Sequence, residues 1–174
     1  MTNTKTGNGS RLKLAKAAGV LFLVVLANLH LEAQSRPAEL RFHLGRAAFP
    51  KASEHLSAGA SYRHYFGKRG WALEPEYSFM TVMSERYHRD DMLILNVVKD
   101  LTRPSRRWSL DMIMGGGIYF HRTKRRFWKG PGGLGWGMGL KIWGNDRFYI
   151  SPQFRIGHSP SFRFSVNLGF APRR

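Results

Sequence analysis

The chain of 174 residues has no cysteine, few acidic residues and only one long apolar run. The absence of cysteine excludes a disulfide scaffold, a Cys-ligated zinc site and a Cys nucleophile. Outside the N-terminus, no segment offers the roughly 18 consecutive apolar residues that a spanning helix needs. Together with a mean hydropathy of −0.35, this excludes a helical multi-span membrane protein. The length suits a single domain, such as one closed barrel or a sandwich.

The 11 Asp and Glu residues are outnumbered by 28 Lys and Arg, which gives a net charge of +17. Such a charge suits nucleic acid, and it equally suits the phosphate-rich headgroups of lipopolysaccharide. The sequence contains no recognisable nucleic-acid module, nucleotide motif or metal motif. We therefore expect no nucleic-acid partner, no cofactor and no bound metal.

The long apolar run lies at the N-terminus and has the order of a secretory signal. Four cations precede the run from Ala17 to Leu31, and small residues such as Ala33 follow it. We predict cleavage near Ala33, which divides the chain into a signal peptide, residues 1–33, and a mature domain, residues 34–174. Cleavage would leave 24 Lys and Arg against 10 Asp and Glu, a net charge of +14. An uncleaved anchor helix is the alternative, although the run is short for one.

Large apolar residues alternate with small or polar residues along most of the remaining chain. Strict alternation with a period of two is the mark of a β-strand whose two faces differ. In the last segment, Phe162, Phe164 and Val166 alternate with Arg163 and Ser165. We predict eight strands, at about residues 38–47, 55–66, 71–82, 92–101, 107–121, 133–143, 147–156 and 161–170.

The connections between these segments alternate between short and long. Compact turn sequences occupy residues 67–70, 102–106 and 144–146, whereas longer polar segments occupy 50–54, 83–91 and 123–132. A transmembrane barrel has this arrangement, with short turns on the periplasmic side and longer loops outside. An even number of strands then places both chain ends on the periplasmic side.

Side-chain size predicts which face of each strand points inward. The polar faces carry many serines and glycines, such as Gly115 and Gly135, which are poor strand formers. Room inside an eight-stranded barrel is limited, so we place this face inside and the large apolar face toward lipid. Aromatic residues at the periplasmic strand ends predict a belt at the membrane interface. These are Phe66, Trp71, Trp108, Phe148 and Phe170.

With these features, residues 38 to 170 resemble the small Gram-negative outer-membrane proteins of the OmpA/OmpX type. The resemblance includes a last strand that is apolar at every second position and ends in an aromatic residue, Phe170. It implies an all-β fold, an eight-stranded antiparallel up-and-down transmembrane β-barrel in the outer membrane. In that class the last aromatic residue is an assembly signal, which implies contact with the barrel-assembly machinery during insertion. We expect a monomer.

Eight charged residues fall on the predicted inward faces. An unpaired buried charge is very costly, so we expect these residues to form a connected network that fills the lumen and blocks a pore. Glu74 and Glu76 point the same way on one strand, and the many nearby cations predict salt bridges rather than a general acid. The eight residues are Arg41, Arg63, Glu74, Glu76, Asp111, Lys141, Arg155 and Arg163.

These features favour an integral outer-membrane protein with a plugged polar interior and a structural or surface-interaction role. A segment that interleaves cations with aromatic residues lies between the fifth and sixth predicted strands. We predict that it is a surface loop that contacts outer-membrane lipid and lipopolysaccharide phosphates. Its residues are Lys124, Arg125, Arg126, Trp128 and Lys129.

Two other functions stay open. Outer-membrane lipid A deacylases of the PagL type carry a His-x-Ser-Asn motif with a later Glu, and the segment from His158 to Ser161 is the candidate here. Pro160 stands where that motif has Ser, and no acidic residue follows Asp146, so we expect no enzyme activity and no catalytic residue. The second alternative is a secreted lipocalin-like barrel. It requires three aromatic side chains to point inward, those of Phe154, Phe162 and Phe164.

Overall fold

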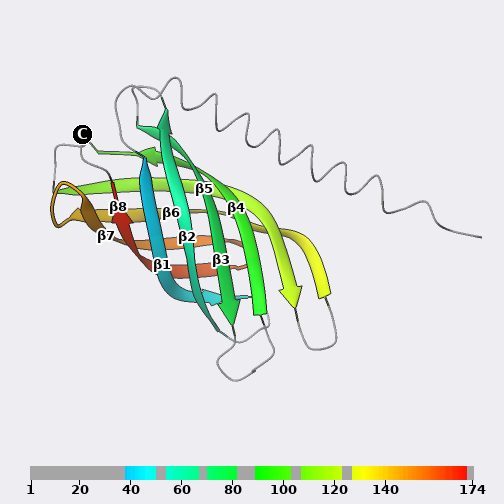
Figure 1. Cartoon of the computed structure of the whole chain (residues 1–174). Helices are drawn as coiled ribbons and strands as arrows, with labels where there is room; N and C mark the ends of the chain where they lie inside the picture. The colour runs from blue at the N-terminus through cyan, green and yellow to red at the C-terminus, as the bar shows by residue number, and fades with distance from the viewer. Residues whose placement is uncertain are drawn as a thin grey trace, which may run out of the picture. The chain divides into compact units, whose positions relative to one another are not determined.

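In the computed structural model, eight strands form one closed barrel (Figure 1). The structure describes residues 38–49, 54–66, 70–81, 89–102, 107–122 and 127–171, so the predicted signal peptide and its cleavage site lie outside the described residues. No helix long and apolar enough to cross a membrane occurs in these ranges. The strands are β1 (Glu39–Ala48), β2 (His55–Phe66), β3 (Trp71–Thr81), β4 (Arg89–Asp100), β5 (Trp108–Arg122), β6 (Phe127–Trp143), β7 (Phe148–His158) and β8 (Phe162–Phe170).

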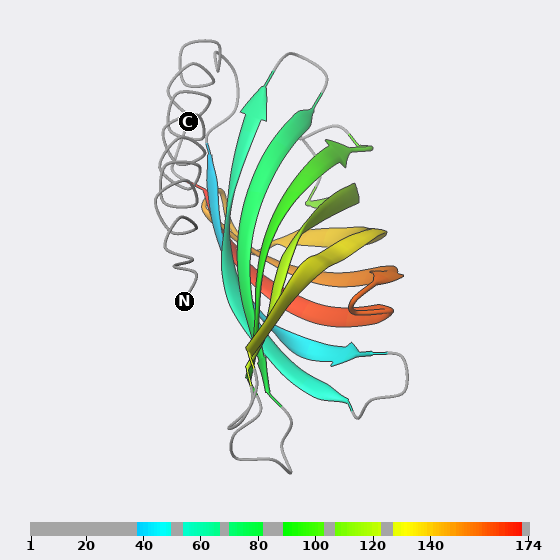
Figure 2. The ribbon, with the colours of Figure 1, turned by 90° about the vertical axis from the view of Figure 1, so that its right-hand side faces the viewer.

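Each strand pairs antiparallel with the next one along the chain, and β1 pairs with β8 to close the barrel. The closing pairs run from Leu40 opposite Phe170 to Ala48 opposite Phe162. This confirms the predicted all-β, eight-stranded antiparallel barrel. Strands β2–β5 form one wall, and β6–β8 lie across from them (Figure 2). We call the end at which β1 begins the termini end, and the end at which β1 leads into β2 the loop end.

The two faces of the barrel wall carry different side chains. In β8, Phe164 and Leu168 are 45% and 61% exposed, whereas Ser165 and Asn167 are 1% and 3% exposed. Large apolar side chains on the other strands are likewise exposed on the outside, because no second layer covers them. Phe154 and Phe162 point outward with Phe164, so the lipocalin-like alternative, which needs all three inside, does not fit this structure.

Strand β6 begins at Phe127, whereas the alternation predicted a start at about residue 133. The long connection expected over residues 123–132 is therefore wrong in its second part, which belongs to the strand. Glycine and proline are rare inside strands, and this is why the segment resembles a loop in sequence. Pro131 is tolerated because β7 pairs with β6 only from Leu134 onward, so Pro131 has a partner on one side alone. Strand β4 also begins earlier than predicted, at Arg89.

A glycine bulge shifts the register between β5 and β6. Gly115 lies opposite Gly135 and Gly117 lies opposite Gly132, so β6 has one more residue than β5 between these pairs. Gly133 has a φ of +65°, in the left-handed region that glycine adopts without steric cost. A bulge bends its strand and increases the local twist. It lies at the loop-end half of the barrel, beside a cavity described below.

Candidate functional site

The polar interior is the candidate functional site, because the buried charges of the described residues are gathered there. All eight charged residues predicted to face inward lie in the lumen, and the most exposed of them, Arg155, has 12% of its side chain accessible. Two further carboxylates join them, Glu39 on β1 and Asp100 at the end of β4. The network therefore holds five cations and five carboxylates.

The termini end of the network is built around Glu39. Lys141 Nζ lies 3.1 Å from Glu39 Oε1 and donates to the Tyr65 hydroxyl at 2.6 Å. The hydroxyls of Tyr65 and Tyr149 donate to the two oxygens of Glu39, at 2.8 and 2.6 Å. Asp100 Oδ1 lies 3.7 Å from the same ammonium group. Both tyrosine rings face the ammonium group at about 5 Å, so the cation is enclosed by carboxylates and aromatic rings.

Arg63 occupies the centre of the network. Its Nε donates to Glu74 Oε2 at 2.6 Å, and its Nη1 donates to Asp111 Oδ2 at 2.6 Å. Arg41 Nη1 donates to the same Glu74 oxygen at 2.7 Å. Charge-assisted hydrogen bonds of this length are strong, and here two guanidinium groups share one buried carboxylate.

The loop-end half of the network is built around Glu76. Arg155 Nη2 lies 3.0 Å from Glu76 Oε2, and Arg163 Nη1 lies 2.5 Å from Glu76 Oε1. Ser78 Oγ donates to Glu76 Oε1 at 2.7 Å, and Asn96 Nδ2 donates to Oε2 at 3.0 Å. Each oxygen of this carboxylate thus has an arginine and a neutral donor. The structure places both Glu74 and Glu76 in salt bridges.

Each cation of the network has an ion pair with a strand that is not its neighbour in the sheet, in addition to closer pairs such as that of Arg63 with Glu74 on the adjacent β3. Arg41 on β1 reaches Glu74 on β3, and Lys141 on β6 reaches Glu39 on β1. The remaining cations behave in the same way, from β2 to β5 and from β7 and β8 to β3. Opposite walls are therefore linked through the lumen as well as through the sheet. Chemically, the arrangement can brace the barrel and occupy its interior.

Several members of this network were not predicted from the sequence. Glu39 has the same phase as Arg41, so continuing the alternation by one step toward the N-terminus would have found it. Tyr65 and Tyr149 are on the inward face as well, but an aromatic residue gives no sequence signal that distinguishes it from packing. Asp100 lies at the last position of β4, where the alternation ends. Its membership follows from the fold alone.

A second polar cluster lies at the loop end and was also missed. Asp90 is fully buried, with Oδ1 lying 2.6 Å from His121 Nδ1 and Oδ2 lying 3.4 Å from His55 Nε2. Phe49 packs against the His55 ring at 4.9 Å and against Tyr119 at 5.6 Å. The cluster joins β2, β4 and β5. Nevertheless, the described ranges contain no group of three or more His, Asp or Glu side chains able to hold a metal ion.

The five residues of the predicted aromatic belt all lie at the termini end. Phe66 lies opposite Trp71 in the β2–β3 pairing, and Phe148 lies opposite Phe170 in the β7–β8 pairing. The rings of Phe148 and Phe170 are 5.1 Å apart. Trp108 begins β5 at the same end and is exposed on the outside. The structure thus places the five aromatic residues at the same end of the barrel.

The predicted lipopolysaccharide-contacting segment is divided by the strand boundary. Lys124, Arg125 and Arg126 lie outside the described residues. Trp128 and Lys129 are in β6, where a surface loop was expected, and Lys129 is exposed. The strand extends further than the sequence indicated because Lys129 pairs with Phe120 of β5. That segment is therefore a strand end and not a loop at these two positions.

Two arrangements resemble parts of a serine hydrolase site. His158 is exposed at the end of β7 and forms no side-chain hydrogen bond with any residue that the structure describes. Ser78 Oγ lies 3.1 Å from His43 Nε2 inside the lumen, but it is fully buried and also bonded to Glu76. A nucleophile needs a base and access to substrate. The second pair has no access, and it acts as a link in the network.

No family model matches the chain, and no curated protein sequence matches it. Several solved structures do match the chain. The barrel has the fold of the small eight-stranded outer-membrane β-barrel proteins.

One similar structure is the crystal structure of Neisserial surface protein A. It matches with a TM-score of 0.53 and 8% sequence identity, over 78% of this chain and 96% of that chain. Another is Ail, the attachment invasion locus protein of Yersinia pestis, with a TM-score of 0.46 and 13% identity, over 77% of this chain and 95% of that chain. At these identities the likeness shows the fold alone. The sequence-based resemblance to this class is confirmed at that level.

Proposed function

We propose that this protein is an integral outer-membrane barrel with a plugged polar interior and a structural or surface-interaction role. The proposal rests on the difference in side chains between the two faces of the barrel wall. Uncovered Phe, Leu, Met and Trp side chains form the outside, and paired charges form the inside. A closed barrel is one of the two structures that satisfy every backbone group in lipid, and an apolar outer surface of this extent is costly in water.

The proposal includes contact with outer-membrane lipid and lipopolysaccharide at the loop end. It also includes passage through the barrel-assembly machinery, and a monomeric state. Exposed cations at that end, among them Arg122 and Lys129, support the contact with phosphate groups. The absence of a free strand edge in the described sheet supports the monomer, because no edge is open to pair with a second copy.

Cell fractionation with heat-modifiability on gels tests the location. We expect the protein in the outer-membrane fraction, with faster migration before boiling than after it. A protein found soluble in the periplasm, with no mobility shift, would contradict the proposal. Planar-bilayer recording tests the plug separately, and we expect no discrete conductance steps. Steady conductance steps from the purified barrel would reject the plugged interior and leave the membrane location unaffected.

A further inference from the structure

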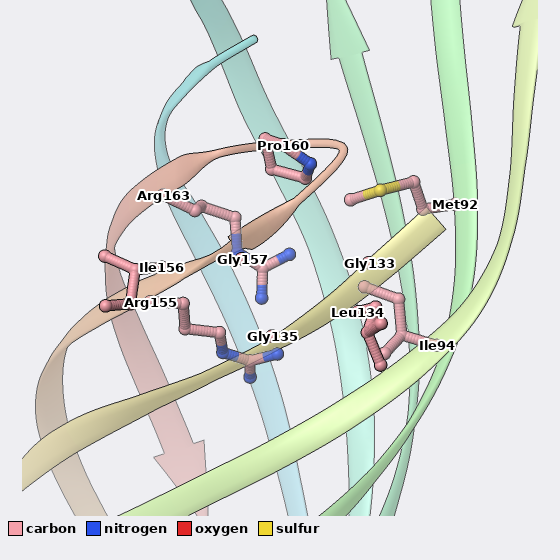
Figure 3. Close-up of a pocket in the computed structure, with 10 residues that line it drawn as sticks. All are labelled: Met92, Ile94, Gly133, Leu134, Gly135, Arg155, Ile156, Gly157, Pro160 and Arg163. Atoms are coloured by element: carbon pink, nitrogen blue, oxygen red, sulfur yellow. The ribbon is translucent and has the colours of Figure 1, made fainter. Parts of the chain in front are cut away.

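A small cavity opens into the loop-end half of the lumen, between the wall of β4, the middle of β6 and the adjoining ends of β7 and β8 (Figure 3). It holds about 310 Å³ of space, including the part that opens to solvent. Arg155 and Arg163 reach into it from β7 and β8, opposite Met92 and Ile94 of β4 (Figure 3). Pro160 lines it near the β7–β8 connection.

The cavity lies where the network has more cations than carboxylates. Arg155 and Arg163 share the single carboxylate of Glu76. Glu74 Oε1 is 3.7 Å from Arg155 Nη2, but its other oxygen is already bonded to Arg41 and Arg63. The next acid toward the loop end, Asp90, has His55 and His121 as its partners.

One donor at the cavity has no acceptor. Arg155 Nη1 donates to Asn96 Oδ1 at 3.0 Å and Nη2 contacts Glu76, but the buried Nε has no hydrogen-bond partner. A buried donor left unsatisfied costs about 1–3 kcal/mol, more for a charged group. An anion beside this guanidinium group would supply an acceptor and offset the excess positive charge.

The glycine bulge forms part of the cavity wall. Gly133 and Gly135 of β6 and Gly157 of β7 line the cavity without side chains. A Cβ at any of the three would collide with a neighbouring atom, so a larger residue there would have to displace the surrounding wall. The apolar side chains at the cavity, Met92 and Ile94, offer contact to hydrocarbon and no further polar partner. The lining therefore combines a cationic part with an apolar part.

We propose that this cavity binds a small organic anion, in which a carboxylate or phosphate head lies beside Arg155 and Arg163 and a short apolar group lies against Met92 and Ile94. This binding site adds to the proposed structural role. It stands independently of the membrane in which the barrel resides, because the side chains that would contact the ligand, those of Arg155, Arg163, Met92 and Ile94, face the lumen.

Methyl NMR of the barrel labelled with 13C-methionine, in neutral phosphatidylcholine nanodiscs, tests the proposal. Met92 reports on the cavity, whereas Met112 and Met114 face outward and report on ligand that only dissolves in the bilayer. Octanoate and octyl phosphate are the probes, and octanol is the neutral control. We expect saturable shifts of Met92 with either anion, no shift with octanol, and no matching shift of Met112.

Shifts of Met92 that equal those of Met112, or that octanol reproduces, would overturn the proposal. If only octanoate shifts the Met92 signal, the ligand is a carboxylate. If only octyl phosphate shifts it, the ligand is a phosphate. Arg155→Gln should weaken binding at least tenfold, and Arg155→Lys should weaken it less. If Arg155→Gln does not fold, Ile94→Phe fills the cavity and should abolish the Met92 shift. Retained binding in the folded filled variant would also overturn the proposal.

Discussion

The Nη1 atom of Arg63 donates to Asp111 Oδ2 at 2.6 Å, across the lumen from β2 to β5. Neither side chain is exposed. Two strands separated by β3 and β4 in the sheet are thus joined by a hydrogen-bonded ion pair. Removing one member of a buried pair leaves the other charge uncompensated, and that loss exceeds what the intact pair contributes.

Replacement of Arg63 by Met should therefore destabilise the barrel by about 3–5 kcal/mol. Glu74 and Asp111 would both lose their shortest contact with this guanidinium group. Urea unfolding from lipid vesicles measures the change. Arg46→Met is the matched control, because Arg46 pairs with Glu54 on the surface with both side chains largely exposed. It should cost less than about 1 kcal/mol, and equal losses for the two variants would place Arg63 outside the lumen.

Glu76 should tolerate Gln better than Leu. Leu removes both acceptor oxygens for Arg155, Arg163, Asn96 and Ser78. Gln loses the charge and places an NH2 group against two of these donors, but it keeps one acceptor oxygen. We expect a loss of about 3–5 kcal/mol for Glu76→Leu and a smaller loss for Glu76→Gln in the same unfolding assay. Two equal losses would show that the oxygen retained by Gln adds nothing to stability.

Gly169→Ala should be destabilising because the Tyr149 ring lies directly against this glycine. An added methyl group would move the ring, whose hydroxyl donates to Glu39 at 2.6 Å. Overpacking of this kind typically costs about 1–3 kcal/mol. Gly144→Ala is the control, since a Cβ there meets only one atom, at 3.8 Å. The unfolding midpoints in urea should separate the two variants. A Gly169→Ala variant with an unchanged midpoint would mean that Tyr149 is free to move.

Labels on the outside of β8 should lie in lipid. The chain has no cysteine, so Phe164→Cys and Val166→Cys each provide one labelling site on the exposed face. A fluorophore at either position should be quenched by brominated lipid and not by aqueous iodide. Asp146→Cys, in the exposed turn between β6 and β7, should give the opposite result. Quenching of the β8 labels by iodide alone would reject a lipid-facing strand.

Expression in a host with intact lipopolysaccharide should leave the acylation of lipid A unchanged. A Ser/His site needs a nucleophile and a base in hydrogen-bond reach, and His158 contacts no such group among the described residues. Mass spectrometry of the extracted lipid A is the measurement, with His158→Ala as the matched variant. Loss of an acyl chain that depends on His158 would establish an enzyme.

The strand faces could be predicted from the sequence, and the pairing of the charges could not. Alternation states which side of the wall Arg63 and Asp111 occupy, but it carries no information on their relative height in the barrel. That height depends on the register of β2 to β5, which forms only when the sheet closes. The start of β6 was missed for a different reason. Pro131 reads as a loop residue unless the position of β7 is known.

The seam between β1 and β8 has a consequence for how this barrel forms. Leu40 and Phe170 lie near opposite ends of the described chain, and the barrel closes only when they pair. Contacts so distant in sequence give a high contact order, and such topologies fold slowly. Glu39 on β1 finds its ammonium partner on β6 and a hydroxyl donor on β7. Charge burial and seam closure therefore depend on the last strands to be synthesised, and a chain that stops before them would leave Glu39 without its ammonium partner beside an open edge.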